Sequence, residues 1–389
     1  MSTEMKKIAI LNIEKKVNHL YAEVQIDSQK EVIQTEVSDN LIDSLVYDRI
    51  DAYVWGFIYF AMVNGYDIKS DLPITDELLY NLNYQFIPAM CAANDGWHIV
   101  KIDAPVVEPI APVLHRVATG ISCGIDSLYT IKFHESVREI SSRRIDSLTF
   151  FNVGSSMKSS DVLRTPLVEG RMKLAKKFAL EYGYDFIFVE SNIHLIIHKY
   201  DEYNHVANHT YMMLFCVYSI MKCISTYYYS SGYPFSQFKI NAPSSAACYD
   251  LLTLATASVA HLHFYSSGSH VSRMEKTAAL VDYTPAKKYL NVCVESDQNC
   301  GECFKCVRTM LTLDAMGCLK DFDAVFDLAS YAHNRNKFLD RMYLSAVLQK
   351  DVYSKEILPL FNCFGIGRVF CIWVGLVLRK LRTLFGKIF

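Results

Sequence analysis

Short apolar runs alternate with helix-length segments over residues 113–224, and this alternation constrains the fold more than any other feature of the sequence. The expected strands are Val113–Ile121, Ser147–Val153 and Asp185–Glu190, and the expected helices are Asp126–Glu135, Glu169–Tyr182 and His209–Ile224. Strands separated by helices need crossover connections, which give a parallel sheet with helices on both faces. The sequence therefore predicts an α/β fold whose ligands sit beyond the carboxyl ends of the strands.

The segments on either side of this region have different patterns. Residues 1–110 alternate like strands in "HLYAEVQI" and "EVIQTEV" and then become helix-like in "DRIDAYVWGFIYFAMVNG". A chain of 389 residues is long enough for more than one core. We therefore expect a smaller α+β domain over residues 1–110, the main α/β domain over 111–320, and a helical region over 321–389.

Composition and net charge indicate which classes of protein this chain can belong to. The chain is 51% hydrophobic and 21% charged, which suits a globular enzyme. Its net charge of −2 argues against a surface coated for nucleic acid, so nucleic acid is disfavoured as a partner. The first twenty residues lack a secretory signal, which predicts a cytoplasmic protein. Assembly into a homo-oligomer is left open.

The stretch "SCGIDS", Ser122–Ser127, falls between the first expected strand and its helix. Gly124 lets the backbone approach an anion, and the free N–H groups and dipole of the helix start favour negative charge there. The hydroxyls of Ser122 and Ser127 can donate to phosphate oxygens, whereas an ionised Asp126 is suited to holding Mg²⁺ or orienting a neighbour. The alternative is that Asp126 simply caps the helix after a glycine turn.

Four of the twelve cysteines cluster in "LNVCVESDQNCGECFKCVRTM". They are Cys293, Cys300, Cys303 and Cys306. In a reducing compartment such a cluster indicates metal binding or reactivity and not a disulfide framework. Four thiolates suit a tetrahedral Zn²⁺ ion with no open position, which predicts a structural metal. An iron–sulfur cluster and a redox dithiol are the alternatives.

Both motifs carry a resemblance to a known superfamily. "SCGIDS" resembles the S-G-G-x-D-S signature of the PP-loop ATP pyrophosphatases, which belong to the adenine nucleotide alpha hydrolase-like (HUP-like) proteins. The later order of a helix containing Lys276, then Cys293, then "CGECFKCVR" is similar to the zinc segment of the 7-cyano-7-deazaguanine synthase family. The resemblance covers roughly Val113–Thr309. It departs from the pattern at Cys123, where the signature has glycine.

The resemblance implies an ATP-dependent, AMP-forming ligase or synthase that adenylates a carboxylate or carbonyl oxygen of a small-molecule substrate for attack by nitrogen, with ATP, Mg²⁺ and Zn²⁺ as cofactors. It implies that the loop binds pyrophosphate and its magnesium through Ser122, Cys123, Gly124, Ile125, Asp126 and Ser127. It places Asn152, Val153 and Gly154 near adenosine, and makes Lys276 and Arg273 the candidates for neutralising phosphate in the transition state. The alternative for Lys276 and Arg273 is a solvated helix face.

Two rival functions remain open. PP-loop domains with zinc cysteines also thiolate tRNA, and Cys123 would then be a candidate for the reactive sulfur. A non-catalytic protein that keeps the nucleotide fold is the other rival, and its main support is the same departure at Cys123.

Two further segments invite functional interpretations. His194, His198, His205 and His209 are dense, but the tetrathiolate already accounts for a metal, so they are expected to be structural. Near the end of the sequence, the apolar run Val369–Leu378 is about half of the roughly 20 residues needed to span a bilayer. It is followed by Arg379, Lys380, Arg382 and Lys387, a pattern that suits a helix on the inner face of an anionic membrane. Docking of this helix on the protein's own core is the alternative.

Overall fold

The computed structural model describes residues 6–136, 140–155, 162–349 and 351–385, with side chains described up to Leu378 in the last range. Contacts divide the chain into two compact units, Met1–Ser272 and Arg273–Phe389. The domain boundaries expected near residues 110 and 320 remain predictions.

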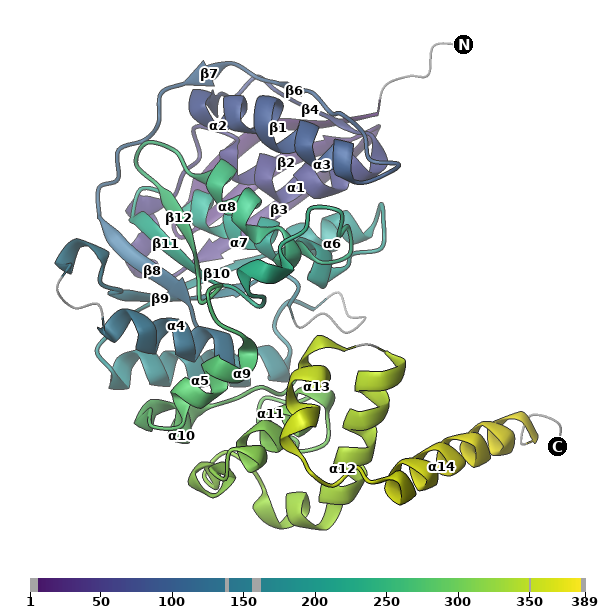
Figure 1. Cartoon of the computed structure of the whole chain (residues 1–389). Coiled ribbons are helices and arrows are strands. Elements are labelled where there is room, and N and C mark those ends of the chain that lie inside the picture. The colour runs from purple at the N-terminus through teal and green to yellow at the C-terminus, as the bar shows by residue number, and fades with distance from the viewer. Residues whose placement is uncertain (1–5, 137–139, 156–161, 350, 386–389) are drawn as a thin grey trace. The chain divides into compact units, whose positions relative to one another are not determined.

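A ten-stranded sheet forms the centre of the first unit, in the order β12-β11-β8-β9-β10-β3-β2-β1-β4-β6 (Figure 1). Its strands are β1 (Lys7–Lys16), β2 (His19–Ile26), β3 (Gln29–Val37), β4 (Asp67–Ser70), β6 (Ile102–Asp103), β8 (Arg116–Gly120), β9 (Ser147–Asn152), β10 (Asp185–Ser191), β11 (Ile224–Ser230) and β12 (His263–Ser267). A separate two-stranded sheet pairs β5 (Ile74–Thr75) with β7 (Val106–Val107).

The strands β8 to β12 are all parallel and confirm the predicted α/β class. The connecting helices are α4 (Ile125–Ser136), α5 (Pro166–Glu181), α6 (Ile193–His198), α7 (His205–Ser219) and α8 (Asp250–Ala257). Figure 1 shows α4 and α5 on one side of these strands and α7 and α8 on the other. After β8 the chain adds β9 and β10 on one side of β8. It then adds β11 and β12 on the other side, so the strand order reverses at β8. In sheets of this kind ligands bind at such a reversal.

The N-terminal strands continue the same sheet. β3 pairs antiparallel with β10 through Val37 and Val189 and through Thr35 and Ser191. The backbone groups on that edge of β10 are therefore satisfied by a segment far away in the sequence. The structure does not confirm a separate N-terminal domain, although the strands and the long helix expected there do form.

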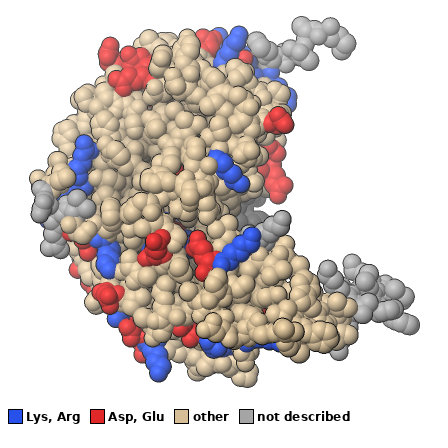
Figure 2. All heavy atoms as spheres, viewed as in Figure 1, with Lys and Arg blue, Asp and Glu red and all other residues tan. Residues whose placement is uncertain are grey.

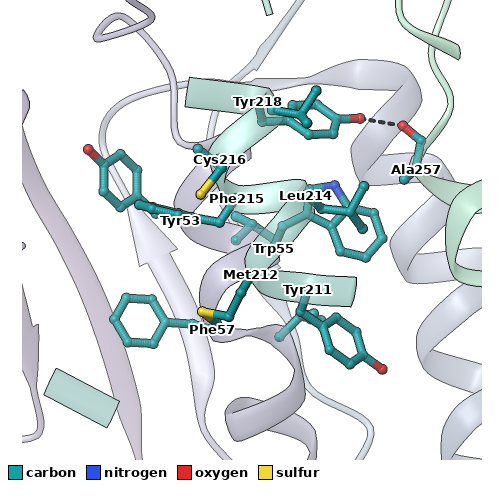
Figure 3. Packing of buried hydrophobic residues seen from close by; sticks show 14 of the residues in the cluster. Tyr53, Trp55, Phe57, Tyr211, Met212, Leu214, Phe215, Cys216, Tyr218 and Ala257 are labelled. Atoms are coloured by element: carbon teal, nitrogen blue, oxygen red, sulfur yellow. Dashed lines mark hydrogen bonds between the residues drawn. The ribbon is translucent and has the colours of Figure 1, made fainter. Parts of the chain in front are cut away.

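The first unit is held together by a core between α1 (Asp51–Asn64) and α7. α1 is apolar on all sides and almost wholly buried, as expected for a helix inside a core. Figure 3 shows Trp55 of α1 among the rings of Tyr211, Phe215 and Tyr218 from α7. The hydroxyl of Tyr218 donates to the carbonyl oxygen of Ala257 at 2.5 Å, which satisfies a polar group that burial would otherwise leave unpaired.

Short helical segments of the first unit include α2 (Asp76–Asn81), a π-helical turn (Leu82–Phe86) and α3 (Ile87–Ala93). The second unit contains only helices among its described elements: α9 (Arg273–Leu280), α10 (Thr284–Tyr289), α11 (Phe304–Ala315), α12 (Leu328–Leu348), α13 (Val352–Ile357) and α14 (Ile366–Phe385). In the described part of the chain, no helix combines the length and the apolar character needed to cross a bilayer.

On the face of the molecule shown in Figure 2, acidic and basic side chains are interspersed. The described residues on that face form no broad basic patch. A nucleic acid surface would be expected to gather cations along one face.

Candidate functional site

The loop from Ile121 to Gly124 links β8 directly to α4 at the point where the strand order reverses. The backbone N–H of Ile121 donates to the carbonyl oxygen of Thr149 at 2.9 Å, which ties the start of the loop to β9. The N–H of Leu128 donates to the carbonyl oxygen of Gly124 at 3.0 Å and closes the first turn of α4. The predicted strand-to-helix turn is therefore present.

Cys123 has a backbone φ of 56°, in the left-handed region that favours glycine. The PP-loop signature has glycine at this position. Cys123 adopts the backbone conformation that glycine adopts easily, so the loop here can have the same shape as a loop with glycine. Its side chain is fully buried, and burial raises the pKa of the thiol to about 12. The sulfur thus belongs to the core beneath the loop and is poorly suited to act as a nucleophile.

The two serines of the loop are hydrogen-bonded to each other and to the backbone. The Ser122 and Ser127 hydroxyls lie 3.2 Å apart, and the N–H of Gly124 donates to the Ser122 oxygen at 3.3 Å. Ser127 is buried and donates to the carbonyl oxygen of Gly124 at 3.1 Å, whereas Ser122 is exposed. Ser127 therefore braces the turn, and Ser122 is the serine that an anion could reach.

Aromatic and imidazole side chains gather near the acid of this loop. Burial raises the pKa of the Tyr229 hydroxyl at the end of β11. The negative charge of Asp250 adds to this increase, and that of Asp126 adds a smaller part. The Tyr229 hydroxyl lies 2.5 Å from Nδ1 of His209 on α7. One turn earlier, Nδ1 of His205 lies 3.1 Å from the hydroxyl of Tyr203. Tyr229 and His209 thus bring a phenol and an imidazole to the end of β11, which pairs with β8.

The sequence predicts Asp126 in the site and a structural role for His205 and His209. The dense polar run "KYDEYNHVANH" and the aromatic run "STYYYSSGYPF" are the available signals for the other residues. Neither signal shows that the start of α7 meets the end of β11, because that meeting depends on a crossover in three dimensions.

The residues expected near adenosine lie at the end of β9 as predicted. The Asn152 amide donates to the Glu190 carboxylate at 2.6 Å and to the carbonyl oxygen of Leu163 at 3.0 Å, so this side chain braces neighbouring segments. Gly154 has a φ of 100°, and a Cβ there would lie 2.7 Å from a ring carbon of Tyr203. The Tyr203 hydroxyl donates to the carbonyl oxygen of Val153 at 3.2 Å. The adenosine role of Asn152, Val153 and Gly154 stays a prediction.

Lys276 and Arg273 lie on α9 in the second unit, and their predicted action on phosphate stays untested. Lys276 is 1% exposed, which does not fit the alternative of a solvated helix face. The Arg273 guanidinium lies 5.6 Å from the ring centre of Tyr353, and that of Arg308 lies 4.1 Å from the same ring. Arg273, Arg308 and Tyr353 line a small hollow in this unit together with Glu356.

The four clustered cysteines converge as predicted. The sulfurs of Cys293, Cys300, Cys303 and Cys306 all lie within 4.8 Å of one another, and those of Cys293 and Cys303 are 4.0 Å apart. A zinc ion with four Zn–S bonds of about 2.3 Å holds its sulfurs about 3.8 Å apart. The four sulfurs are therefore close enough together to hold a tetrahedral ion, and the donor set suits zinc.

Backbone N–H groups surround the sulfurs. Glu295 and Ser296 donate to the Cys293 sulfur at 3.3 and 3.2 Å, and the N–H of Cys306 donates to the Cys303 sulfur at 3.5 Å. Burial acts to raise the pKa of Cys293, but backbone N–H donors outweigh it and lower that pKa to about 7. At Cys293 these donors favour the thiolate, which is the form that binds metal, whereas burial raises the pKa values of Cys300 and Cys306.

The cluster is anchored in its own unit. Asn299 donates to the carbonyl oxygens of Leu290 and Val325 at 2.8 and 3.0 Å, and Gly301, with a φ of 73°, makes the turn between Cys300 and Cys303. In the described part of the chain, this is the one group of three or more His, Cys, Asp or Glu side chains placed to share a metal. His194, His198, His205 and His209 form no second group of that kind.

The chain was compared with models of known protein families and with curated proteins, and neither comparison finds a match.

Proposed function

We propose that this protein is an ATP-dependent, AMP-forming ligase or synthase of the PP-loop type, acting on a small molecule. The observation that carries the proposal is the loop Ser122–Ser127, which follows a central parallel strand at the reversal of strand order and opens a twelve-residue helix. Phosphate groups bind well at such a place because unpaired N–H groups and the helix dipole point toward it.

In this proposal the main chain of the loop holds the pyrophosphate part of ATP. The burial of Cys123 supports it, because the side chain that departs from the signature is directed into the core and does not crowd an anion at the loop. Ser122 adds a hydroxyl donor. Asp126, half-buried at the start of α4, holds the magnesium that accompanies the phosphates.

The reaction proceeds by two displacements. An oxygen of the substrate carboxylate or carbonyl attacks the α-phosphorus, the bond to the bridging oxygen breaks, and pyrophosphate leaves. Nitrogen then attacks the activated carbon, and AMP leaves with its oxygen. The nitrogen loses a proton in this step, and His209, hydrogen-bonded to Tyr229 at the end of β11, would be its acceptor.

The zinc cluster has a structural part in this proposal. Four thiolates fill the coordination sphere, so the ion has no position for a substrate or a water molecule. Binding zinc would instead fix the segment between α10 and α11.

The buried thiol of Cys123 counts against the sulfur-transfer rival. A thiol with a pKa raised to about 12 supplies very little thiolate at neutral pH. The net charge of −2 also gives tRNA little general attraction.

The test incubates the full chain, with its zinc, with ATP, Mg²⁺, ammonium and a panel of small carboxylic acids, and measures AMP and pyrophosphate. Release of both in equal amounts is expected, with loss of at least about a hundredfold in Asp126→Asn because the metal contact is removed. Asp43→Asn is the control, since this carboxylate is fully exposed on the same unit. Formation of ADP and phosphate instead, or full activity of Asp126→Asn, would contradict the proposal.

A further inference from the structure

Helix α14 presents a continuous apolar stripe to solvent. Its members are Ile366, Phe370, Val374, Val377 and Leu378, with exposed fractions of 93, 67, 39, 53 and 55%. They recur at intervals of three and four residues, so they lie on one face of the helix. A cluster of large exposed apolar side chains of this kind marks an interaction surface.

The opposite side of the helix holds it to its own unit. Arg368 donates to the Asp340 carboxylate of α12 at 2.9 Å and to the carbonyl oxygen of Asn336 at 3.1 Å. One turn further along, Ile372 is 5% exposed. The contacts that dock α14 therefore use Arg368 and Ile372 and leave the apolar stripe uncovered.

The charge of this segment indicates which kind of surface could cover the apolar stripe. Residues 366–389 contain Arg368, Arg379, Lys380, Arg382 and Lys387 and no acidic residue, in a chain whose net charge is −2. The side chains of Arg379, Lys380 and Arg382, and the whole of Lys387, lie outside the described residues, so their charge is a fact of the sequence. An apolar face combined with an excess of cations matches a bilayer surface that carries anionic lipids.

We propose that α14 lies in the plane of an anionic membrane surface, with the stripe Ile366–Leu378 at the acyl boundary and the basic residues among the head groups. The helix is not apolar enough to cross a bilayer, which agrees with a position on the surface. Attachment of this kind would hold the whole chain at the membrane. It does not depend on the proposed ligase activity.

The experiment measures co-sedimentation of the full chain with vesicles of phosphatidylcholine alone and with vesicles containing about one third phosphatidylserine. Binding to the anionic vesicles is expected and should weaken as salt is raised, since screening reduces the attraction. Phe370→Glu should reduce the bound fraction about tenfold or more, because it places a charge in the stripe. The double variant Lys380→Glu/Arg382→Glu should reduce it comparably through the head-group contacts.

Leu180→Glu is the matched control, since Leu180 is 66% exposed on helix α5 of the other unit and its replacement should leave binding unchanged. Circular dichroism of each variant establishes that it is folded before binding is compared. Failure of the natural chain to bind anionic vesicles would overturn the proposal. So would a dimer in light scattering that Phe370→Glu dissociates, because a second copy would then cover the stripe.

Discussion

The hydroxyl of Tyr229, at the end of β11, lies 2.5 Å from Nδ1 of His209, on the first turns of α7. The two rings are stacked, with an interplanar angle of 5°. This contact joins two segments at the reversal of strand order, beside the loop that carries Asp126. It pairs a phenol with an imidazole, two groups that can move a proton.

Replacing Tyr229 by phenylalanine tests that coupling. Tyr229→Phe removes the partner of the imidazole and should lower kcat for AMP formation by about tenfold to a hundredfold, with little change in ATP affinity. Single-turnover kinetics and ATP titration separate the two effects. An unchanged kcat would remove Tyr229 from the proposed mechanism.

Cys123→Gly should keep both the loop and its activity. Glycine relieves the left-handed φ of 56°, a gain of about 1 kcal/mol that offsets the loss of a buried sulfur. Cys123→Ser should retain turnover as well, although a buried hydroxyl costs about 1–3 kcal/mol of stability. The measurements are AMP release and chemical unfolding. Complete loss of turnover in both variants, with ATP binding intact, would favour sulfur transfer.

The purified chain should contain about one zinc ion, and Cys303→Ser should abolish it, because a tetrathiolate site needs all four sulfurs. Elemental analysis gives the metal content, and the thermal unfolding temperature should fall with zinc loss. Cys318→Ser is the control, since Cys318 lies in the same unit outside the cluster. Iron in place of zinc would contradict the assignment.

Gly154→Ala should destabilise the first unit more than Gly183→Ala does. Both glycines have positive φ, 100° and 75°, so both variants pay for a left-handed alanine. A Cβ at Gly154 would also meet Tyr203 at 2.7 Å, whereas one at Gly183 meets nothing within 4 Å. The difference in unfolding free energy should be about 1–3 kcal/mol. Equal effects would mean that Tyr203 moves aside without cost.

The buried carboxyl of Asp51 should make stability depend on pH. Burial raises its pKa from 3.8 to about 6, so the folded state prefers the protonated form. Below about pH 3.8 the protonated carboxyl contributes fully to the free energy of unfolding. This contribution is lost as pH rises to about 6, and the loss is up to about 3 kcal/mol. Asp51→Asn keeps an oxygen for the Thr75 N–H and should be more stable than the natural chain at neutral pH. The two should converge near pH 4, as measured by urea unfolding, and a pH-independent difference would refute this account.

Local pattern was sufficient to predict several elements and one site. Strand β9 and helix α4 lie within about a residue of their expected positions, because apolar periodicity and the glycine turn act over short distances. The helix expected over His209–Ile224 instead spans His205–Ser219, since Asn204 caps its start and β11 takes over at Ile224. The cysteine cluster was predictable because tight turns bring C-x-x-C sulfurs together without help from the rest of the fold.

The sequence by itself thus determined the α/β class, the strand-loop-helix turn at Ser122–Ser127 and the candidate zinc ligands. Only the tertiary structure decided that β3 pairs with β10 and that Tyr229 meets His209. It also decided that Cys123 points into the core and that Lys276 is buried. The physical reason is the distance along the sequence over which each feature is determined. Turns and helices depend on neighbouring residues in the chain, whereas strand partners and burial depend on the packing of distant segments.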